Sequence, residues 1–228
     1  MDLREIAELL QEGKAKQVKQ LIQQALEEGI PAQVLLDDAL IAGMNEIGEK
    51  FKKNEIFVPQ VLVAARAMNT GMEVLRPSLV AGGGCDKENS VCEGSNPSTA
   101  IINGRVCIGT VKGDLHDIGK NLVKMMLEAK GLRVFDLGTD VLPEEFIQTA
   151  IEKDCQVICC SALLTTTMSA LADVVKEAEK AGIRDRVKIM VGGAPVTETF
   201  CAQIGADGFT YDAASAADMA VQFCKEKL

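Results

Sequence analysis

The single histidine of this 228-residue chain, His116, stands between two aspartates in the glycine-bounded stretch GDLHDIG, residues 113–119. A metal-binding imidazole needs an acceptor that orients its second nitrogen, and Asp114 is two residues away. One histidine cannot form a zinc site, which takes three or four protein ligands, but it can be the axial ligand of a metal that a macrocycle already surrounds. The alternative is a helix-capping turn, in which Asp114 or Asp117 caps the helix and His116 is incidental.

Two further loops contain residue types that suit a narrow binding slot. The stretch SALLTTTM, residues 161–168, carries hydroxyl groups whose ordinary role is to cap the following helix. The stretch GGAPVT, residues 192–197, begins with two glycines, and their missing side chains allow a ligand to approach closely. A phosphate-binding loop is a competing interpretation, but neither GxxxxGK[ST] nor GxGxxG follows the first apolar run of this half.

The elements that must position these loops are strands and helices that alternate along residues 104–228. The apolar runs are typical of buried parallel strands: RVCIGTV, RVFDLG, QVICCSA, VKIMVGG and GADGFTYD. A helical pattern follows each run, which predicts an α/β domain with a Rossmann-like (flavodoxin-like) five-stranded parallel sheet. In such sheets ligands bind beyond the carboxyl ends of the strands, where the three loops above meet.

Residues 1–78 show helical periodicity and predict four helices, the last of which starts at Pro59 and forms a small bundle with the others. Residues 79–103 are rich in Gly, Ser, Asn and Pro, and this composition predicts a flexible linker. Cys85 and Cys92 lie in this linker as a possible metal-ligand pair or, alternatively, as two exposed reduced thiols.

The composition excludes several classes of protein. A net charge of −9 argues against partners such as nucleic acid or an anionic membrane, which need clustered Lys and Arg. The N-terminus has no apolar signal segment, and no apolar run is long enough to span a bilayer. Several of the eight cysteines stand in apolar runs, as buried reduced cysteines do. We expect a cytoplasmic protein with an aliphatic core.

The whole pattern resembles the cobalamin-binding module of methionine synthase and the corrinoid proteins of anaerobic methyltransferase systems. The motif elements D-x-H-x-x-G, S-x-L and G-G occur here in order, as Asp114-x-His116-x-x-Gly119, Ser161-x-Leu163 and Gly192-Gly193. The resemblance extends into the helical half, where FKKNEIFVPQ supplies a phenylalanine and, seven residues later, an aliphatic residue before proline.

The resemblance implies that cobalamin binds with its nucleotide tail in a slot of the sheet and His116 as the lower ligand of cobalt. Asp114 would hydrogen-bond His116, Thr167 would complete the network, and Ala214 would line the tail pocket, while the helical half would cap the corrin. The implied cofactor-binding residues are Gly113, Asp114, Leu115, His116, Asp117, Ile118, Gly119, Ser161, Leu163, Thr165, Thr167, Gly192, Gly193, Ala214, Phe51 and Val58.

The function implied is that of a methyl carrier in anaerobic one-carbon metabolism, with little activity of its own. Its cobalt would alternate between Co(I) and methyl-Co(III). The partners implied are a substrate-specific methyltransferase, a second methyltransferase that uses tetrahydrofolate or a thiol as acceptor, and a reductive activator protein. Similar carriers serve methylamines, methanol, betaines and methoxylated aromatic compounds, so these residues leave the methyl donor open.

Three other functions fit parts of the pattern. The cobalamin subunit of an adenosylcobalamin-dependent mutase shares the nucleotide-binding half, but a substrate barrel instead of a helical cap covers its corrin. A B12-dependent light sensor carries a helical bundle with an added DNA-binding domain, for which residues 1–30 are too few and too acidic. A flavodoxin-like module without a metal would leave the lone histidine and the paired loops unexplained.

Overall fold

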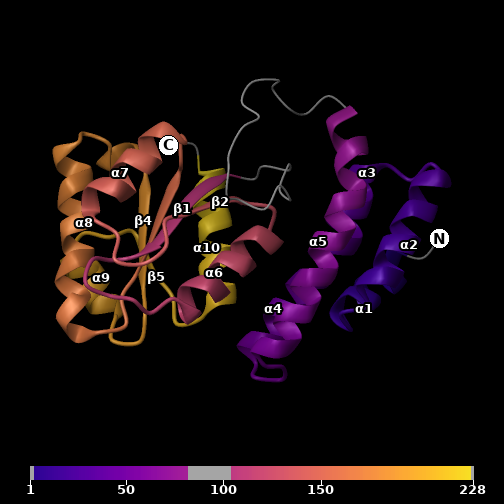
Figure 1. The fold of residues 1–228 in the computed structure, drawn as a ribbon, viewed down its shortest axis with the longest axis horizontal. Coiled ribbons are helices and arrows are strands. Elements are labelled where there is room, and N and C mark those ends of the chain that lie inside the picture. The colour runs from indigo at the N-terminus through magenta and orange to yellow at the C-terminus, as the bar shows by residue number, and fades with distance from the viewer. Residues whose placement is uncertain (1–2, 82–103, 227–228) are drawn as a thin grey trace. The chain divides into compact units, whose positions relative to one another are not determined.

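The computed structural model describes residues 3–81 and 104–226 (Figure 1). The described residues divide into two compact units: residues 3–81 with 129–131, and the rest of residues 104–226. Most of the expected linker lies outside the described residues, together with both of its cysteines, Cys85 and Cys92.

The first unit consists of helices. Their bounds are α1 Leu3–Gln11, α2 Ala15–Glu27, α3 Ala32–Leu35, η1 Leu36–Ile41, α4 Ala42–Lys52 and α5 Val58–Ala81. The elements α3, η1 and α4 follow one another without a break, and η1 is a π-helical turn, so they correspond to the third predicted helix. Helix α2 packs on α5, and α1 packs on α4. Within the described part of the chain, none of the helices has both the length and the apolar character of a bilayer span.

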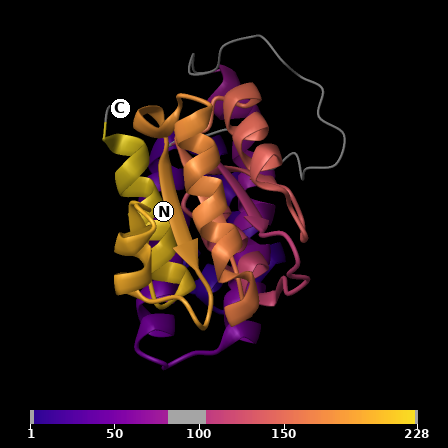
Figure 2. The same cartoon turned by 90° about the vertical axis from the view of Figure 1, so that its left-hand side faces the viewer.

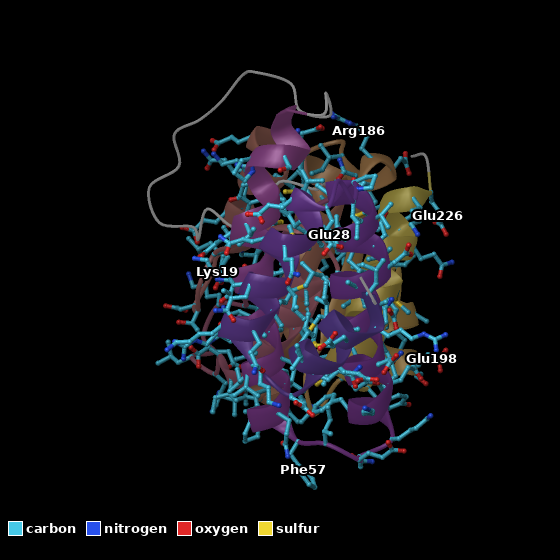
Figure 3. The ribbon with its side chains drawn as sticks, turned by 90° about the vertical axis from the view of Figure 1, so that its right-hand side faces the viewer. Lys19, Glu28, Phe57, Arg186, Glu198 and Glu226 are labelled. Carbon is cyan, nitrogen blue, oxygen red and sulfur yellow. The ribbon has the colours of Figure 1, made fainter. Side chains whose placement is uncertain are left out.

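Two details of this unit differ from the sequence-based expectation. Helix α5 begins at Val58, one residue before Pro59, and it continues to Ala81, three residues into the expected linker. Pro77 lies inside this helix, which is possible because its fixed φ is helical and only one backbone hydrogen bond is lost. Lys19 and Glu28 are exposed charged residues of α2 and its end, and Phe57 projects from the loop before α5 (Figure 3).

The second unit contains the predicted five-stranded sheet. Its strands are β1 Arg105–Thr110, β2 Arg133–Asp136, β3 Val157–Ser161, β4 Lys188–Gly192 and β5 Gly208–Phe209. All neighbouring strands are parallel, in the order β2-β1-β3-β4-β5. The direction in which strands are added reverses between β1 and β3, and ligands of such sheets bind at this switch point.

Helices cover both faces of the sheet (Figures 1 and 2). Their bounds are α6 Ile118–Ala129, α7 Pro143–Glu152, α8 Met168–Lys180, α9 Glu198–Gln203 and α10 Ala213–Lys225, with short 3-10 turns η2 Thr165–Thr167 and η3 Arg184–Arg186. Helices α7, α8 and α9 lie on one face and α6 and α10 on the other. This confirms the α/β, Rossmann-like fold class.

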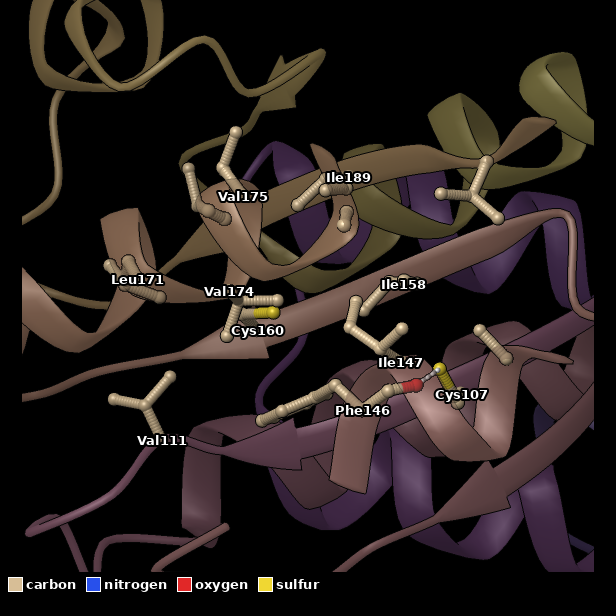
Figure 4. Packing of buried hydrophobic residues seen from close by; sticks show 14 of the residues in the cluster. Cys107, Val111, Phe146, Ile147, Ile158, Cys160, Leu171, Val174, Val175 and Ile189 are labelled. Carbon is tan, nitrogen blue, oxygen red and sulfur yellow. Dashed lines mark hydrogen bonds between the residues drawn. The ribbon is translucent and has the colours of Figure 1, made fainter. Parts of the chain in front are cut away.

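The core between the sheet and helices α7 and α8 is almost entirely aliphatic (Figure 4). Phe146 of α7 is fully buried there against the strands. Buried cysteines fill the remaining space, and burial raises the pKa of the Cys160 thiol well above its usual range, so this thiol is neutral. The described cysteines are therefore free thiols that pack as small apolar residues, as their apolar sequence context predicts.

We expect Gly109→Ala to lower the free energy of unfolding by about 1–3 kcal/mol, the usual cost of overpacking a core. The new Cβ would lie 2.8 Å from the ring of Phe146 and 3.2 Å from Val141. In a Phe146→Leu background the same change should cost less, because leucine does not reach as far. Urea unfolding of the four proteins gives the coupling energy, and purely additive effects would contradict this packing.

Candidate functional site

The histidine loop connects β1 to α6 at the carboxyl edge of the sheet. It turns at Gly113, whose φ of +81° favours glycine. The backbone N–H of Asp114 donates to the carbonyl of Val111 at 3.1 Å, and the hydroxyl of Thr110 donates to the carbonyl of His116 at 2.9 Å. The loop is thus closed on itself, and His116 is carried at its outer end.

Asp114 and His116 form a close pair. Oδ1 of Asp114 lies 2.7 Å from Nδ1 of His116 and also accepts the backbone N–H of His116 at 3.0 Å. The aspartate side chain is completely buried, whereas the imidazole is 52% exposed. An ionised carboxylate can only accept, so Nδ1 carries a proton toward Asp114, and Nε2 is the ring nitrogen that can act as an electron-pair donor to a metal.

The second oxygen of Asp114 joins this loop to the loop after β3. It accepts the backbone N–H of Leu163 at 2.7 Å, the N–H of Leu164 at 3.2 Å and the hydroxyl of Thr167 at 2.9 Å. Burial raises the pKa of Asp114, but the hydrogen bonds from His116, Leu163 and Thr167 outweigh it and hold the pKa well below the usual range. The carboxylate therefore stays ionised although it is buried.

The two glycines at the end of β4 have different roles. A Cβ on Gly193 would lie 1.8 Å from the carbonyl oxygen of Ala162, and the φ of Gly193 is +125°, so only glycine fits there. A Cβ on Gly192 would meet nothing within 4 Å. Gly193 therefore lets the loops after β3 and β4 approach each other, whereas Gly192 borders open space.

Apolar side chains are exposed around the histidine. Leu115 is 72% exposed, Ile118 is 83% exposed, and Leu163 and Leu164 are both about two-fifths exposed. Gly119 also borders open space, since a Cβ there would meet nothing within 4 Å. Such a group of apolar side chains beside a free imidazole nitrogen is suited to a flat, apolar ligand that contains a metal.

The remaining expected residues lie in several environments. Asp117 accepts a hydrogen bond from Asn121 at 2.9 Å and so stabilises the first turn of α6. Ser161 ends β3 opposite Gly192, Thr165 is exposed in η2, and Ala214 is buried at the start of α10.

Phe51 is half-buried on α4, and Val58 is exposed at the start of α5. Both belong to the first unit and are separate from the histidine loop in the sequence. Two residues of the second unit were not expected in the site. Thr110 is part of a strand run and Leu164 is part of an apolar pair, and neither pattern indicates a hydrogen bond to the histidine loop.

The arrangement can supply one metal ligand. Among residues 3–81 and 104–226, no group of three or more His, Cys, Asp or Glu side chains could hold a metal ion. A metal bound at His116 would therefore need most of its ligands from a cofactor.

Comparison with known proteins identifies such a cofactor. Residues 104–220 match the family of B12 binding domains, and residues 2–76 match a second family with the same description. The trimethylamine corrinoid protein 1 of Methanosarcina acetivorans is 44% identical over 188 residues, which cover 82% of this chain and 81% of that protein. The dimethylamine corrinoid protein 3 of the same organism is 39% identical over 94% of this chain and 92% of its own length.

Solved structures agree with these relatives. The methanol:cobalamin methyltransferase complex MtaBC of Methanosarcina barkeri contains a chain that matches with a TM-score of 0.77 and 31% identity, over 97% of this chain and 79% of that chain. A cobalamin-binding protein of Desulfitobacterium hafniense DCB-2 matches with a TM-score of 0.76 and 27% identity, over 97% of this chain and 98% of its own.

The residues on this edge fit a corrinoid. The macrocycle brings its own equatorial ligands, so the protein needs to supply only one ligand, and the free imidazole nitrogen of His116 can be that ligand. The exposed apolar residues and the open space beside Gly192 are consistent with a large ligand that carries a tail. The chain binds cobalamin and belongs to the corrinoid proteins with B12-binding domains.

Proposed function

We propose that this protein is a methyl carrier that binds cobalamin in the base-off form, with Nε2 of His116 as the lower ligand of cobalt. The observation that supports it is the Asp114–His116 pair, in which a buried carboxylate holds the imidazole by Nδ1 at 2.7 Å. When bound, the corrinoid supplies the methyl-transfer chemistry, since its cobalt takes a methyl group from one partner and releases it to another.

The chain's own residues set the strength of this ligand. As Nε2 gives its electron pair to a metal, positive charge develops on the ring, and the carboxylate of Asp114 lies next to the Nδ1 proton to balance that charge. Because Leu163, Leu164 and Thr167 also bond to Asp114, the ring is fixed to two loops of the sheet. The imidazole is therefore already oriented before the cofactor arrives.

The nucleotide tail of the cofactor would enter beside Gly192, where a side chain would meet nothing within 4 Å. Ser161, Leu163, Thr165 and Ala214 are the residues that we assign to this slot. Leu115 and Ile118 are more than two-thirds exposed and would cover apolar parts of the macrocycle, which removes apolar surface from water.

The helical unit would shield the upper face of the corrin. Phe51 and Val58 are the residues assigned to this role, and the exposed side chains of Phe57, Leu62 and Val63 extend the apolar surface at the start of α5. An apolar cover keeps water away from the reacting methyl group. It must also move aside, because methylation and demethylation use the same face of the corrin.

A similar chain occurs in a solved methyltransferase complex, and this supports separate enzymes as the partners of this protein. We assign it a substrate-specific methyltransferase, an acceptor methyltransferase and a reductive activator in the cytoplasm. Relatives at 39–44% identity are named for trimethylamine and dimethylamine, so a methylated amine is the methyl donor we propose. Methyl transfer from trimethylamine and from methanol, each assayed with its methyltransferase, tests this choice.

Cobalamin bound to the full chain in its cobalt(II) state should give an EPR spectrum that one histidine nitrogen splits into triplets. His116 is the only histidine, so labelling histidine with ¹⁵N should turn each triplet into a doublet. The cofactor's own base is unlabelled and cannot cause this change. His116→Ala should retain some cobamide but lose the effect of the label, and triplets that persist after labelling would rule out His116 as the ligand.

Asp114→Asn should lower the free energy of unfolding of the cofactor-free chain by about 1–3 kcal/mol, because its amide N–H₂ would face groups that donate. The folded-state pKa of Asp114 is lowered, so the advantage of the wild type is complete above the unfolded value of about 4. It shrinks as the pH falls from that value toward the lowered folded pKa, because only the unfolded chain takes up the proton in this range. Urea unfolding at about pH 7 and about pH 3.5 measures the difference in free energy of unfolding between the wild type and Asp114→Asn. A difference that is larger at the lower pH would contradict this prediction.

Substitutions of the two glycines at the end of β4 should affect different properties, the stability of the chain and its affinity for the cofactor. Gly193→Ala should destabilise the chain by about 2–3 kcal/mol through its clash with Ala162. Gly192→Val should change the stability little but raise the Kd for hydroxocobalamin about tenfold or more, because its side chain occupies the proposed slot. Thermal unfolding and spectroscopic titration measure the two effects, and unchanged binding by Gly192→Val would place the tail elsewhere.

A further inference from the structure

Asp140, in the loop after β2, forms two hydrogen bonds with the start of the histidine loop. Its Oδ1 accepts the backbone N–H of Gly113 at 2.7 Å, and its own N–H donates to the carbonyl of Asp114 at 3.0 Å. Asp140 makes these bonds with a φ of +58°, a backbone conformation that residues other than glycine rarely adopt. The two bonds hold the backbone immediately before His116.

The same loop contacts the other end of the histidine loop through a buried ion pair. The side chain of Lys120, in the first turn of α6, is only 2% exposed, and its Nζ donates to Oδ1 of Asp136 at 2.6 Å. Asp136 ends β2 and also binds Lys124, which is 32% exposed, at 3.0 Å. A buried ammonium group is costly unless it is paired, so this contact fixes the start of α6 against β2.

The loop itself is anchored to the sheet. The N–H of Thr110 donates to the carbonyl of Gly138, and the N–H of Val141 donates to the carbonyl of Thr110, each at 3.0 Å. These bonds continue the pairing of β1 and β2 past their last paired residues. The segment from Asp136 to Val141 therefore supports the histidine loop from the β2 side. The loop after β3, which binds Asp114, supports it from the opposite side.

We infer that residues 136–141 act as a clamp that holds the histidine loop at both ends, and that Asp140 and Lys120 are positioning residues for the bond between His116 and cobalt. This inference rests on the proposed role of His116 as the lower ligand. Neither residue contacts the imidazole, so their role differs from that of Asp114, which orients the ring. The clamp removes the freedom of the loop before the ligand bond forms, and this strengthens that bond.

The test compares the fraction of histidine-ligated cobalt(II) cobalamin in the ¹⁵N-histidine EPR spectrum of each full-length variant. Asp140→Gly keeps the backbone conformation accessible but removes the acceptor for Gly113, and it should lower the equilibrium constant for ligation about tenfold. Asp140→Asn keeps an acceptor oxygen, so its equilibrium constant for ligation should be close to that of the wild type. Asp154→Gly is the matched control, because Asp154 has a φ of +51° and lies before β3, at the opposite end of the strand from Ser161.

The ion pair has its own matched control on the same carboxylate. Lys120→Met removes the buried partner of Asp136, keeps much of the apolar stem, and should lower the ligation constant about tenfold. Lys124→Met removes the more exposed partner of Asp136 and should leave ligation unchanged. Thermal unfolding of each variant shows whether the protein is folded at the temperature at which it is loaded with cofactor.

The outcomes separate the clamp from the proposed function. If the wild type shows no ¹⁵N effect, His116 is not the ligand and both statements fail. If the wild type shows it but Asp140→Gly and Lys120→Met ligate as the wild type does, the clamp alone is wrong. Equal losses in Asp140→Gly and Asp154→Gly would also overturn it.

A measurement without cofactor supports or opposes the same conclusion. Hydrogen exchange of the Gly113 amide should become about tenfold faster in Asp140→Gly but not in Asp140→Asn, because only glycine lacks the acceptor. Unchanged exchange in Asp140→Gly would mean that the bond to Gly113 does not hold the loop, and the inference would fail even if the variant binds cobalamin poorly.

Discussion

The carboxylate of Asp114 accepts hydrogen bonds from two separate loops, and the position of His116 depends on both sets. One oxygen binds the backbone and ring of His116, while the other binds Leu163, Leu164 and Thr167. A buried charge is unfavourable by itself, but here several donors surround it and its pKa stays low. In the proposed role of His116, the same charge that joins the loops would also make the imidazole a stronger electron-pair donor.

The parallel sheet makes this arrangement possible. Its strands bring the loops after β1, β3 and β4 to one edge, and the reversal of strand order between β1 and β3 leaves a place where a ligand can enter. Gly193 permits the close contact with Ala162 that brings the last two loops together. The fold therefore supplies a rigid frame, while the side chains at the edge stay exposed for a large cofactor.

The histidine loop is held by two kinds of contact that differ in purpose. Asp114 and its partners determine which way the ring points and which nitrogen is free. Asp140 and the Lys120–Asp136 pair hold the backbone on either side of the ring. If His116 is the ligand, as we propose, its position depends on this support, because no second protein ligand would correct an error in position.

The fold class and the positions of the motif residues at strand ends are predictable from the sequence, and the resemblance to corrinoid proteins implies the cofactor. The apolar runs with intervening helices predict the parallel sheet, and Asp114, His116 and the glycine pair appear at strand ends in the order that corrinoid proteins share. These features were predictable because burial, turn preference and motif spacing are local properties of a chain. The extension of α5 past Pro77 was not, since a proline inside a helix usually argues for an end.

The hydrogen bonds between separate loops are visible only in the tertiary structure. The amide of Leu163 reaches Asp114 across 49 positions of sequence, and Gly113 reaches Asp140 across 27. Nothing in local periodicity encodes such pairings, because they depend on where parallel strands end in space. The roles of Thr110, Asp140 and Lys120 became visible only there, since each looks in the sequence like an ordinary strand, turn or helix residue.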